Sequence, residues 1–213
     1  MIKHFKFLTV LFLFINTGLV NAQDTLQIDK KLYYRVTIGA GIGYGYPLQE
    51  KHDFGIGANI EFALQKQMAV YGLGARGLQE FQIFAYANVT NSVSSIDMTY
   101  GRIFKKGAFF TSVSGGIGLV IGVQQGKLLS SGGGGFHSYS YYEKLVYHTI
   151  GFPLSAKIFW MPRKNNGLIK NLSGGLGIEL FVNINSQKTF YGINLCTQLR
   201  FKSPKNKKQK TFK

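Results

Sequence analysis

Residues 172–184, which read Leu-Ser-Gly-Gly-Leu-Gly-Ile-Glu-Leu-Phe-Val-Asn-Ile, alternate between two kinds of side chain. The even positions are mostly large and apolar, whereas most of the odd positions are small or polar. Successive side chains of a β-strand point to opposite faces, so this segment is typical of a strand with one apolar face. The pattern resumes over residues 190–201, with Tyr191 and Phe201 on the apolar face. Two adjacent strands of about membrane-spanning length, roughly 9–11 residues, predict part of a barrel wall in lipid.

The same alternation occurs in six earlier segments of the chain. Eight strands is the smallest even number that closes a bacterial outer-membrane barrel. The sequence therefore predicts an all-β protein, an eight-stranded antiparallel up-and-down transmembrane β-barrel over residues 33–201. The six earlier strands are expected at residues 33–46, 54–64, 68–77, 95–104, 109–123 and 146–160.

The lengths of the connections favour one orientation of this barrel. In outer-membrane barrels the periplasmic turns are short and the external loops are long. With the N-terminus inside, the two longest loops fall outside. The external loops are then 47–53, 78–94, 124–145 and 185–189, and the internal turns are 65–67, 105–107 and 161–171.

The first 22 residues have the three parts of a signal peptide: a positive start, an apolar core at residues 7–15 and small residues at 20–22. The apolar core is too short to cross a bilayer as a helix, which needs about 20 residues. We therefore expect export and cleavage after residue 22. A short N-terminal segment, residues 23–32, would precede the barrel, and the final location would be the cell outer membrane.

The chain is strongly basic, with 25 Lys and Arg residues against 9 Asp and Glu residues. Much of this excess lies in residues 202–213, which contain six lysines and no acidic residue. Blocks of like charge are usually disordered and solvated, so this segment is expected to be a basic disordered tail. Nucleic acid is excluded as a partner because the leader directs the chain out of the cytoplasm. Anionic lipid head groups, or solubility alone, would account for the charge.

No cofactor and no metal site are expected. Cys196 is the only cysteine, which excludes an internal disulfide framework and a multi-cysteine metal site. The glycine-rich segment 39–45 lacks the third glycine of a nucleotide-binding loop, and it lies within a predicted strand instead of at a strand-to-helix turn.

A soluble barrel is the competing interpretation, because alternation alone does not say which face meets water. The exposed polar face of a soluble barrel should be rich in Lys, Glu and Thr. Here that face is mostly Gly, Ser and Asn, which suits the cramped interior of an eight-stranded barrel. Aromatic residues near the strand ends also favour the membrane, since outer-membrane barrels carry aromatic girdles at both interfaces. The selected interface aromatics are Tyr34, Tyr44, Tyr46, Trp160, Tyr191 and Phe201.

Three segments carry a family resemblance: the Ala-Gln junction at 22–23, the glycine-rich strand 36–44, and Ile-Gly-Phe-Pro-Leu-Ser-Ala-Lys at 150–157. With them the chain resembles the small outer-membrane β-barrel proteins of Gram-negative bacteria, in particular the broad outer-membrane beta-barrel group that includes PorT-like proteins. The resemblance covers nearly the whole mature chain and implies its location and fold. These barrels often end on an aromatic residue that assists recognition by the assembly machinery. Phe201 matches that residue, but twelve residues follow it.

Seven charged residues are assigned to the predicted lumen face. Unpaired charge inside a narrow barrel is costly, so Glu61 and Glu179 are expected to pair with cations. An ion-paired plug is the favoured interpretation, since small barrels fill their interiors with side chains. A narrow, anion-preferring pore is the alternative, because positive groups are in excess. The seven residues are Arg35, Glu61, Arg76, Arg102, Lys157, Glu179 and Arg200.

A lipid-modifying enzyme is a second alternative, because some small outer-membrane barrels modify lipids with a His and a Ser near the outer leaflet. Here the enzyme would use His137 with Ser138 or Ser140 and Glu143, or the lipid-facing His148. A serine nucleophile needs a base within hydrogen-bonding reach and a third group that orients the base. Nothing in this glycine-rich segment fixes such a geometry, so no catalytic residue is assigned.

The favoured function is a structural, adhesive or envelope-assembly role without catalysis. Binding would use the external loops, above all residues 126–142 with their tyrosines. Loops on a rigid scaffold commonly carry binding sites. The expected partners are outer-membrane lipid and an envelope protein that contacts these loops.

Overall fold

A computed structural model of the chain describes residues 32–46, 55–80, 85–87, 89–134, 137–161 and 172–202. No helix in these ranges is long and apolar enough to cross a bilayer. The predicted signal peptide and the loop 47–53 lie outside the described residues, as does most of the N-terminal segment and of the basic tail. Lys202, expected in the tail, is instead the last residue of a strand.

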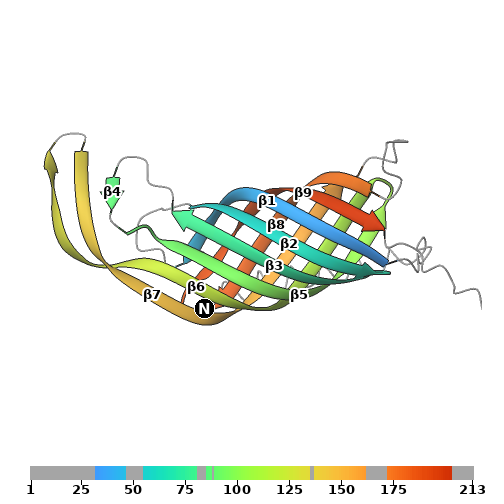
Figure 1. Cartoon of the computed structure of the whole chain (residues 1–213), viewed down its shortest axis with the longest axis horizontal. Coiled ribbons are helices and arrows are strands. Elements are labelled where there is room, and N and C mark those ends of the chain that lie inside the picture. Colours follow the sequence, from blue (N-terminus) through green and yellow to red (C-terminus); the bar gives the residue numbers. More distant parts are fainter. Residues whose placement is uncertain are drawn as a thin grey trace, which may run out of the picture. The chain divides into compact units, whose positions relative to one another are not determined.

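Eight long antiparallel strands close into a ring in the described part of the chain (Figure 1). Around the ring the order is β1, β2, β3, β5, β6, β7, β8 and β9, and β9 pairs with β1. This arrangement confirms the predicted fold class, an up-and-down barrel. The ring strands are β1 (Leu32–Tyr46), β2 (Gly55–Lys66), β3 (Ala69–Glu80), β5 (Ser92–Lys106), β6 (Phe109–Gly134), β7 (His137–Trp160), β8 (Leu172–Asn185) and β9 (Thr189–Lys202).

Each strand directs one set of side chains into the lumen and the other set outward. In β2, for example, Asn59 and Gln65 are buried, whereas Ile60 and Phe62 are exposed. The outward set is large and apolar around the whole ring. Soluble proteins rarely expose apolar surface on this scale. An apolar outer face around a partly polar lumen is instead typical of a membrane barrel.

Two tight turns close one end of the barrel, which we call the turn end: residues 67–68 join β2 to β3, and residues 107–108 join β5 to β6. The first residue of each turn has a positive φ, 57° and 62° respectively. The predicted turns at 65–67 and 105–107 fall one to two residues early, because the strands continue up to the turns. The opposite end, where β8 and β9 are joined by residues 186–188, is called the loop end.

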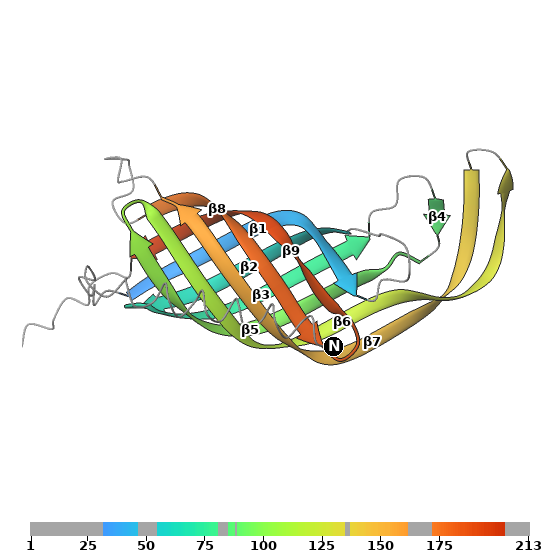
Figure 2. The ribbon, with the colours of Figure 1, turned by 180° about the vertical axis from the view of Figure 1, so that it is seen from behind.

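The prediction that residues 124–145 form a loop is wrong. Beyond the barrel wall β6 and β7 continue as a two-stranded ribbon, paired from Gln124 with Leu145 to Gly134 with His137. Figures 1 and 2 show this ribbon, residues 124–134 and 137–145, leaving the wall. Residues 127–131 of the ribbon are all exposed, so neither face has to be apolar there and no alternating pattern results.

A short strand, β4 (Ala85–Ala87), pairs in parallel with residues 138–140 of the ribbon. It lies within the predicted loop 78–94. The connection between β3 and β5 is shorter than this prediction, because β3 continues to Glu80 and β5 begins at Ser92. The ribbon is therefore a small three-stranded sheet over this part of its length.

Candidate functional site

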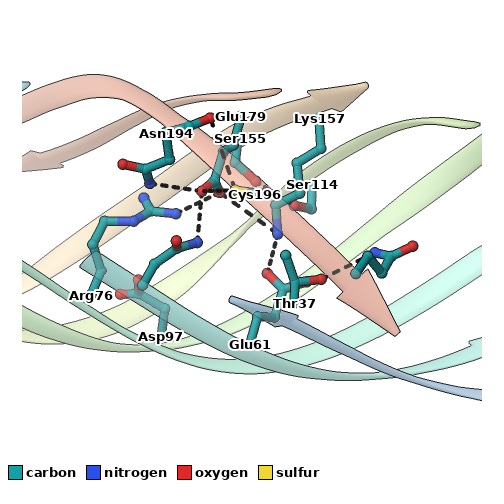
Figure 3. A network of polar contacts seen from close by, with 12 residues as sticks. Thr37, Glu61, Arg76, Asp97, Ser114, Ser155, Lys157, Glu179, Asn194 and Cys196 are labelled. Atoms are coloured by element: carbon teal, nitrogen blue, oxygen red, sulfur yellow. Dashed lines mark hydrogen bonds and ion pairs between the residues drawn. The ribbon is translucent and has the colours of Figure 1, made fainter. Parts of the chain in front are cut away.

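Four charged side chains from four strands meet inside the lumen (Figure 3). Lys157 of β7 lies between two carboxylates, since its Nζ is 2.5 Å from Glu61 Oε2 of β2 and 3.6 Å from Glu179 Oε1 of β8. Arg76 of β3 also binds Glu179, with Nη2 2.7 Å from Oε1. We call these four residues the lumen cluster. Their charges balance, and the four strands are thereby joined across the interior of the barrel.

The Glu179 carboxylate is the centre of this cluster and is 0% exposed. Besides its two cationic partners, its Oε2 accepts hydrogen bonds from Asn59 Nδ2 at 2.7 Å and from Asn194 Nδ2 at 3.0 Å. The Arg76 guanidinium in turn stacks 4.0 Å from the centre of the Phe181 ring. These contacts compensate the loss of water around the carboxylate, as a buried ion pair requires.

Asp97 of β5 is a lumen carboxylate that the sequence analysis did not select. It is buried, accepts a hydrogen bond from Ser95 Oγ at 3.0 Å, and lines a small cavity together with Arg76. The signal was available in the sequence, because Asp97 alternates with the apolar residues Ile96 and Met98. Alternation in β5 thus identifies an inward acid as well as the outward face.

Apolar side chains fill the lumen on both sides of the lumen cluster. The resulting order along the barrel axis is apolar, polar, apolar, which is a packed interior of the kind that eight-stranded barrels have. At the turn end the buried apolar residues are Ala63, Val70, Ile103, Phe110, Phe159, Met161 and Cys196, and at the loop end they are Leu78, Val93, Val120, Phe181 and Phe190.

Arg35 and Arg200 face the lumen but do not belong to the lumen cluster. They are cross-strand partners on β1 and β9 near the turn end. Their guanidinium carbons lie 5.4 and 5.1 Å from the centre of the Phe110 ring, and that of Arg200 lies 3.6 Å from the centre of the Tyr33 ring. Cation–π contacts therefore accompany both charges.

The prediction that Arg102 faces the lumen is wrong. Arg102 is exposed on the outer face of β5, whereas its neighbours Gly101 and Ile103 are buried. The period of two that directs Asp97 inward places the even-numbered residues of β5 outside. Arg102 pairs with Ala69 beside a tight turn, where a long cationic side chain can extend to the water at the turn end.

Aromatic side chains lie on the outer face at two levels. At the turn end Tyr34 pairs with Phe201 across β1 and β9, and Trp160 is exposed at the same end. At the loop end the rings of Tyr44 and Tyr191 stack with their centres 6.1 Å apart. Tyr34 and Tyr44 are about ten residues apart, which corresponds to about 25 Å across the barrel wall at a strand tilt of about 40°. That height matches the apolar band of outer-membrane barrels.

The turn-end level also contains two tyrosines that the sequence analysis did not select. Tyr71 and Tyr100 are exposed cross-strand partners whose ring centres lie 5.2 Å apart. The side chain of Tyr46, which was selected, lies outside the described residues.

Hydrogen bonds of Asn91 connect the base of the ribbon to the barrel. Its backbone N and its Nδ2 donate to Glu80 Oε2 at 3.2 and 2.8 Å, and its Oδ1 accepts a hydrogen bond from the backbone N of Gln125 at 2.9 Å. The Gln125 side chain donates from Nε2 to the carbonyl oxygen of Val89 at 2.7 Å. The first residues of the ribbon are therefore held by the segment that leads into β5.

The described side chains show no catalytic arrangement at the candidate residues. His148 is exposed on the outer face of β7, opposite Ile121, and no hydrogen bond joins it to a serine or a carboxylate among the described residues. His137 lies at the far end of the ribbon, and its side chain is outside the described part. In the described ranges, no group of three or more His, Cys, Asp or Glu side chains could hold a metal ion.

The closed ring, the apolar outer face and the filled lumen define a small β-barrel of the outer-membrane type. No family model and no curated protein matches the sequence. The fold is similar to Neisserial surface protein A, with a TM-score of 0.50 at 9% identity, over 81% of this chain and 97% of that chain. This likeness shows a shared fold, and the narrower resemblance to PorT-like proteins stays a prediction.

Two further solved structures show a weaker likeness. Ail, the attachment invasion locus protein of Yersinia pestis, has a TM-score of 0.48 at 10% identity, over 80% of this chain and 99% of that chain. The N-terminal β-barrel domain of Pseudomonas aeruginosa OprF has a TM-score of 0.40 at 10% identity, over 81% and 98%.

Proposed function

We propose that the protein is exported to the outer membrane, where the barrel anchors an external ribbon that binds a partner in an adhesive or envelope-assembly role. The observation that carries this proposal is the length of two strands. β6 and β7 have 26 and 24 residues, against 12 to 15 in the other ring strands. The additional residues do not form part of the barrel wall, so we infer that their function depends on the ribbon that they form beyond it.

The position of the ribbon supports an external binding role. It leaves the loop end, and the short turns at the opposite end are of the periplasmic kind. Because Asn91 and Gln125 fix its base, the ribbon is presented in a defined direction. Pre-organisation of this kind reduces the entropy lost when a partner binds.

The side chains of the ribbon support the same role. Leu128, Leu129, Tyr139 and Tyr141 are all exposed, and the two tyrosine rings meet edge to face with their centres 6.1 Å apart. Tyrosine supplies a large contact area at a low entropic cost. Beyond Val123, the edge of β6 that faces away from β7 has no strand partner among the described residues, so its backbone groups can pair with an extended segment.

The filled lumen supports binding over conduction. A pore that prefers anions needs a continuous hydrated path lined by positive groups, whereas Lys157 is buried and held by two carboxylates. We expect no stepwise conductance when the folded protein is added to planar bilayers. Reproducible channels with an anion preference would instead support the pore.

The binding role is tested by replacing residues 126–142 with a two-residue Asn-Gly turn. The shortened chain should still migrate as a heat-modifiable barrel and fractionate with the outer membrane. Bacteria that display the intact chain should show surface adherence, aggregation or a co-purifying envelope protein, and bacteria that display the shortened chain should not. A matched variant keeps the ribbon but changes Leu128, Leu129, Tyr139 and Tyr141 to Ser, and it should show the same loss. Equal binding by all three chains would refute the role, and release of the protein by osmotic shock would refute the location.

A further inference from the structure

Exposed positive charge is concentrated at the turn end of the barrel. Within the described ranges the acidic side chains all lie elsewhere, in the lumen, at the loop end or on the ribbon. The turn end therefore carries a positive potential, which attracts anions. Its exposed cations are Lys66, Arg102, Lys105 and Lys106, and the described acidic residues are Glu61, Glu80, Asp97, Glu143 and Glu179.

Two of these cations flank a small residue on the outer face. Lys66 of β2 pairs with Ala69 of β3, and Ala69 pairs with Arg102 of β5, so the three residues form one row across three strands. By the period of two, all three belong to the outward sets of their strands. Neighbouring strands lie about 4.8 Å apart, so the backbones at Lys66 and Arg102 are about 10 Å apart. Only the methyl group of Ala69 lies between them, which leaves space above it for an anion that both long side chains can reach.

No acidic side chain in the described part of the chain balances these two charges. The ion pairs there join Arg76 and Lys157 to Glu61 and Glu179 inside the lumen. Two neighbouring cations repel each other, and an anion between them replaces this repulsion with two attractions. Arginine binds phosphate through paired N–H groups, and lysine binds it as a point charge. The row therefore suits a phosphate group.

A pair of tyrosines lies one outward row nearer the middle of the wall. Tyr71 follows Ala69 by two residues on β3, Tyr100 precedes Arg102 by two residues on β5, and the two exposed rings lie 5.2 Å apart. Tyrosine rings on membrane proteins lie at the level of the lipid head groups. The row with Lys66 is on the water side of these rings, where the phosphates of the lipid are. We call the outer surface formed by these five residues the Ala69 surface.

The next outward row is apolar. Phe62, Leu73 and Met98 are cross-strand neighbours there, and they are 54%, 54% and 67% exposed. From the turn end inward the order is thus cations, tyrosines and large apolar side chains. This is the order of the phosphate, the glycerol region and the acyl chains of a phospholipid. A free phosphate ion would contact only the first of these rows, so the surface fits a lipid better than a soluble anion.

We propose that the Ala69 surface binds a glycerophospholipid with an anionic head group, with its phosphate between Lys66 and Arg102 and its acyl chains over the apolar row. An anionic head group is favoured over a zwitterionic one, because no acid in the described part of the turn end would hold the ammonium of choline or ethanolamine. In the proposed orientation this lipid belongs to the periplasmic leaflet. The inference rests on the location of the barrel in lipid, which is part of the proposed function, and does not depend on binding by the ribbon.

The test is native mass spectrometry of the full folded chain, released from uncharged maltoside micelles that contain graded amounts of lipid. The probes are phosphatidylglycerol and phosphatidylcholine with the same acyl chains. Phosphatidylglycerol should be bound at least about tenfold more tightly, because each of the two cations is attracted to the net charge of the lipid. Glycerol 3-phosphate, which lacks the acyl chains, should not displace it. Equal binding of the two lipids, or displacement by glycerol 3-phosphate, would overturn the proposal.

Variants assign the lipid preference to this surface. Lys66→Gln combined with Arg102→Gln should remove the preference for phosphatidylglycerol. Lys127→Gln combined with Lys144→Gln, which removes the same charge from the exposed ribbon, should keep it. Ala69→Leu keeps both cations but fills the space between them, so it should weaken the preference while heat-modifiable migration is kept. A preference that both double variants lose equally would belong to the total charge of the chain and would overturn the proposal.

The lipid site and the role of the ribbon can fail separately. The chain in which a two-residue turn replaces residues 126–142 should bind phosphatidylglycerol as the intact chain does. Lost adherence with this preference preserved would count against the ribbon alone. Normal adherence by the intact chain without any preference between the two lipids would count against the Ala69 surface alone.

Discussion

Glu179 shows how much of the lumen depends on a single side chain. It accepts two ion-pair contacts and two amide hydrogen bonds while fully buried. Glu179→Ala should lower the free energy of unfolding by about 3–5 kcal/mol, because it leaves Arg76 without its carboxylate and Lys157 with only Glu61. The measurement is the urea midpoint of heat-modifiable migration in detergent.

Two further variants separate charge from shape at this position. Glu179→Gln keeps an acceptor for Asn59 and Asn194 and should cost less than the alanine variant. Lys106→Ala, on an exposed lysine at the turn end, should leave the midpoint unchanged. An unchanged midpoint for Glu179→Ala would show that the lumen cluster does not hold the barrel together.

For single residues, the sequence predicts that a buried charge is paired better than it predicts which residue is the partner. Burial alone requires that Glu61 and Glu179 meet cations, and both do. The partner of Glu61 is Lys157, 96 residues away, and their meeting depends on the stagger of strands around the ring. The alternation of β5 alone could have excluded Arg102 from the lumen, since Met98, Tyr100 and Arg102 alternate on the same outward face.

Two glycines of β8 test the packing of one whole strand. A Cβ on the inward Gly177 would overlap the carbonyl oxygen of Ile158 and the Phe159 ring, whereas the nearest atom to a Cβ on the outward Gly174 is 3.7 Å away. Gly177→Ala should therefore destabilise the barrel by about 1–3 kcal/mol through overpacking. Gly174→Ala should be neutral or slightly stabilising. Equal urea midpoints for the two variants would contradict a tightly filled lumen.

Asn91 tests the attachment of the ribbon. Asn91→Ala removes its two side-chain hydrogen bonds, from Nδ2 to Glu80 Oε2 and from the Gln125 backbone N to Oδ1, each of which contributes about 0.5–1.5 kcal/mol. Hydrogen exchange of the ribbon amides should become faster, while exchange in β1 and β9 stays slow. Ser130→Ala, on an exposed residue of the ribbon, is the control. Unchanged exchange in the Asn91 variant would mean that the ribbon is ordered by its own pairing alone.

The strands of the ribbon could not be predicted from alternation in the sequence. Alternation arises where one face of a strand meets lipid and the other meets a packed interior, as in residues 172–184. Neither condition holds over residues 127–131, which are all exposed, and glycine and serine dominate the segment 124–134. The pairing there comes from the neighbouring strand, which a single-strand pattern does not contain.

For the whole molecule, Trp160 reports the placement of the barrel in lipid. It is the only tryptophan and lies exposed on the outer face at the turn end. In bilayers of brominated lipids its fluorescence should be quenched most strongly by bromines near the head groups. In a Trp160→Phe background, Leu119→Trp in the middle of the wall should be quenched most by deep bromines. A soluble barrel would show no quenching at either position.

Cys196 can report how often the folded barrel opens. It is the sole cysteine, it is 0% exposed, and it lies where the apolar cluster at the turn end meets the lumen cluster, with Sγ 4.0 Å from Glu179 Oε2. A maleimide reagent can therefore reach the thiol only when the interior of the barrel opens. The rate of labelling measures how often the closed wall separates, in the native sequence and without an introduced probe.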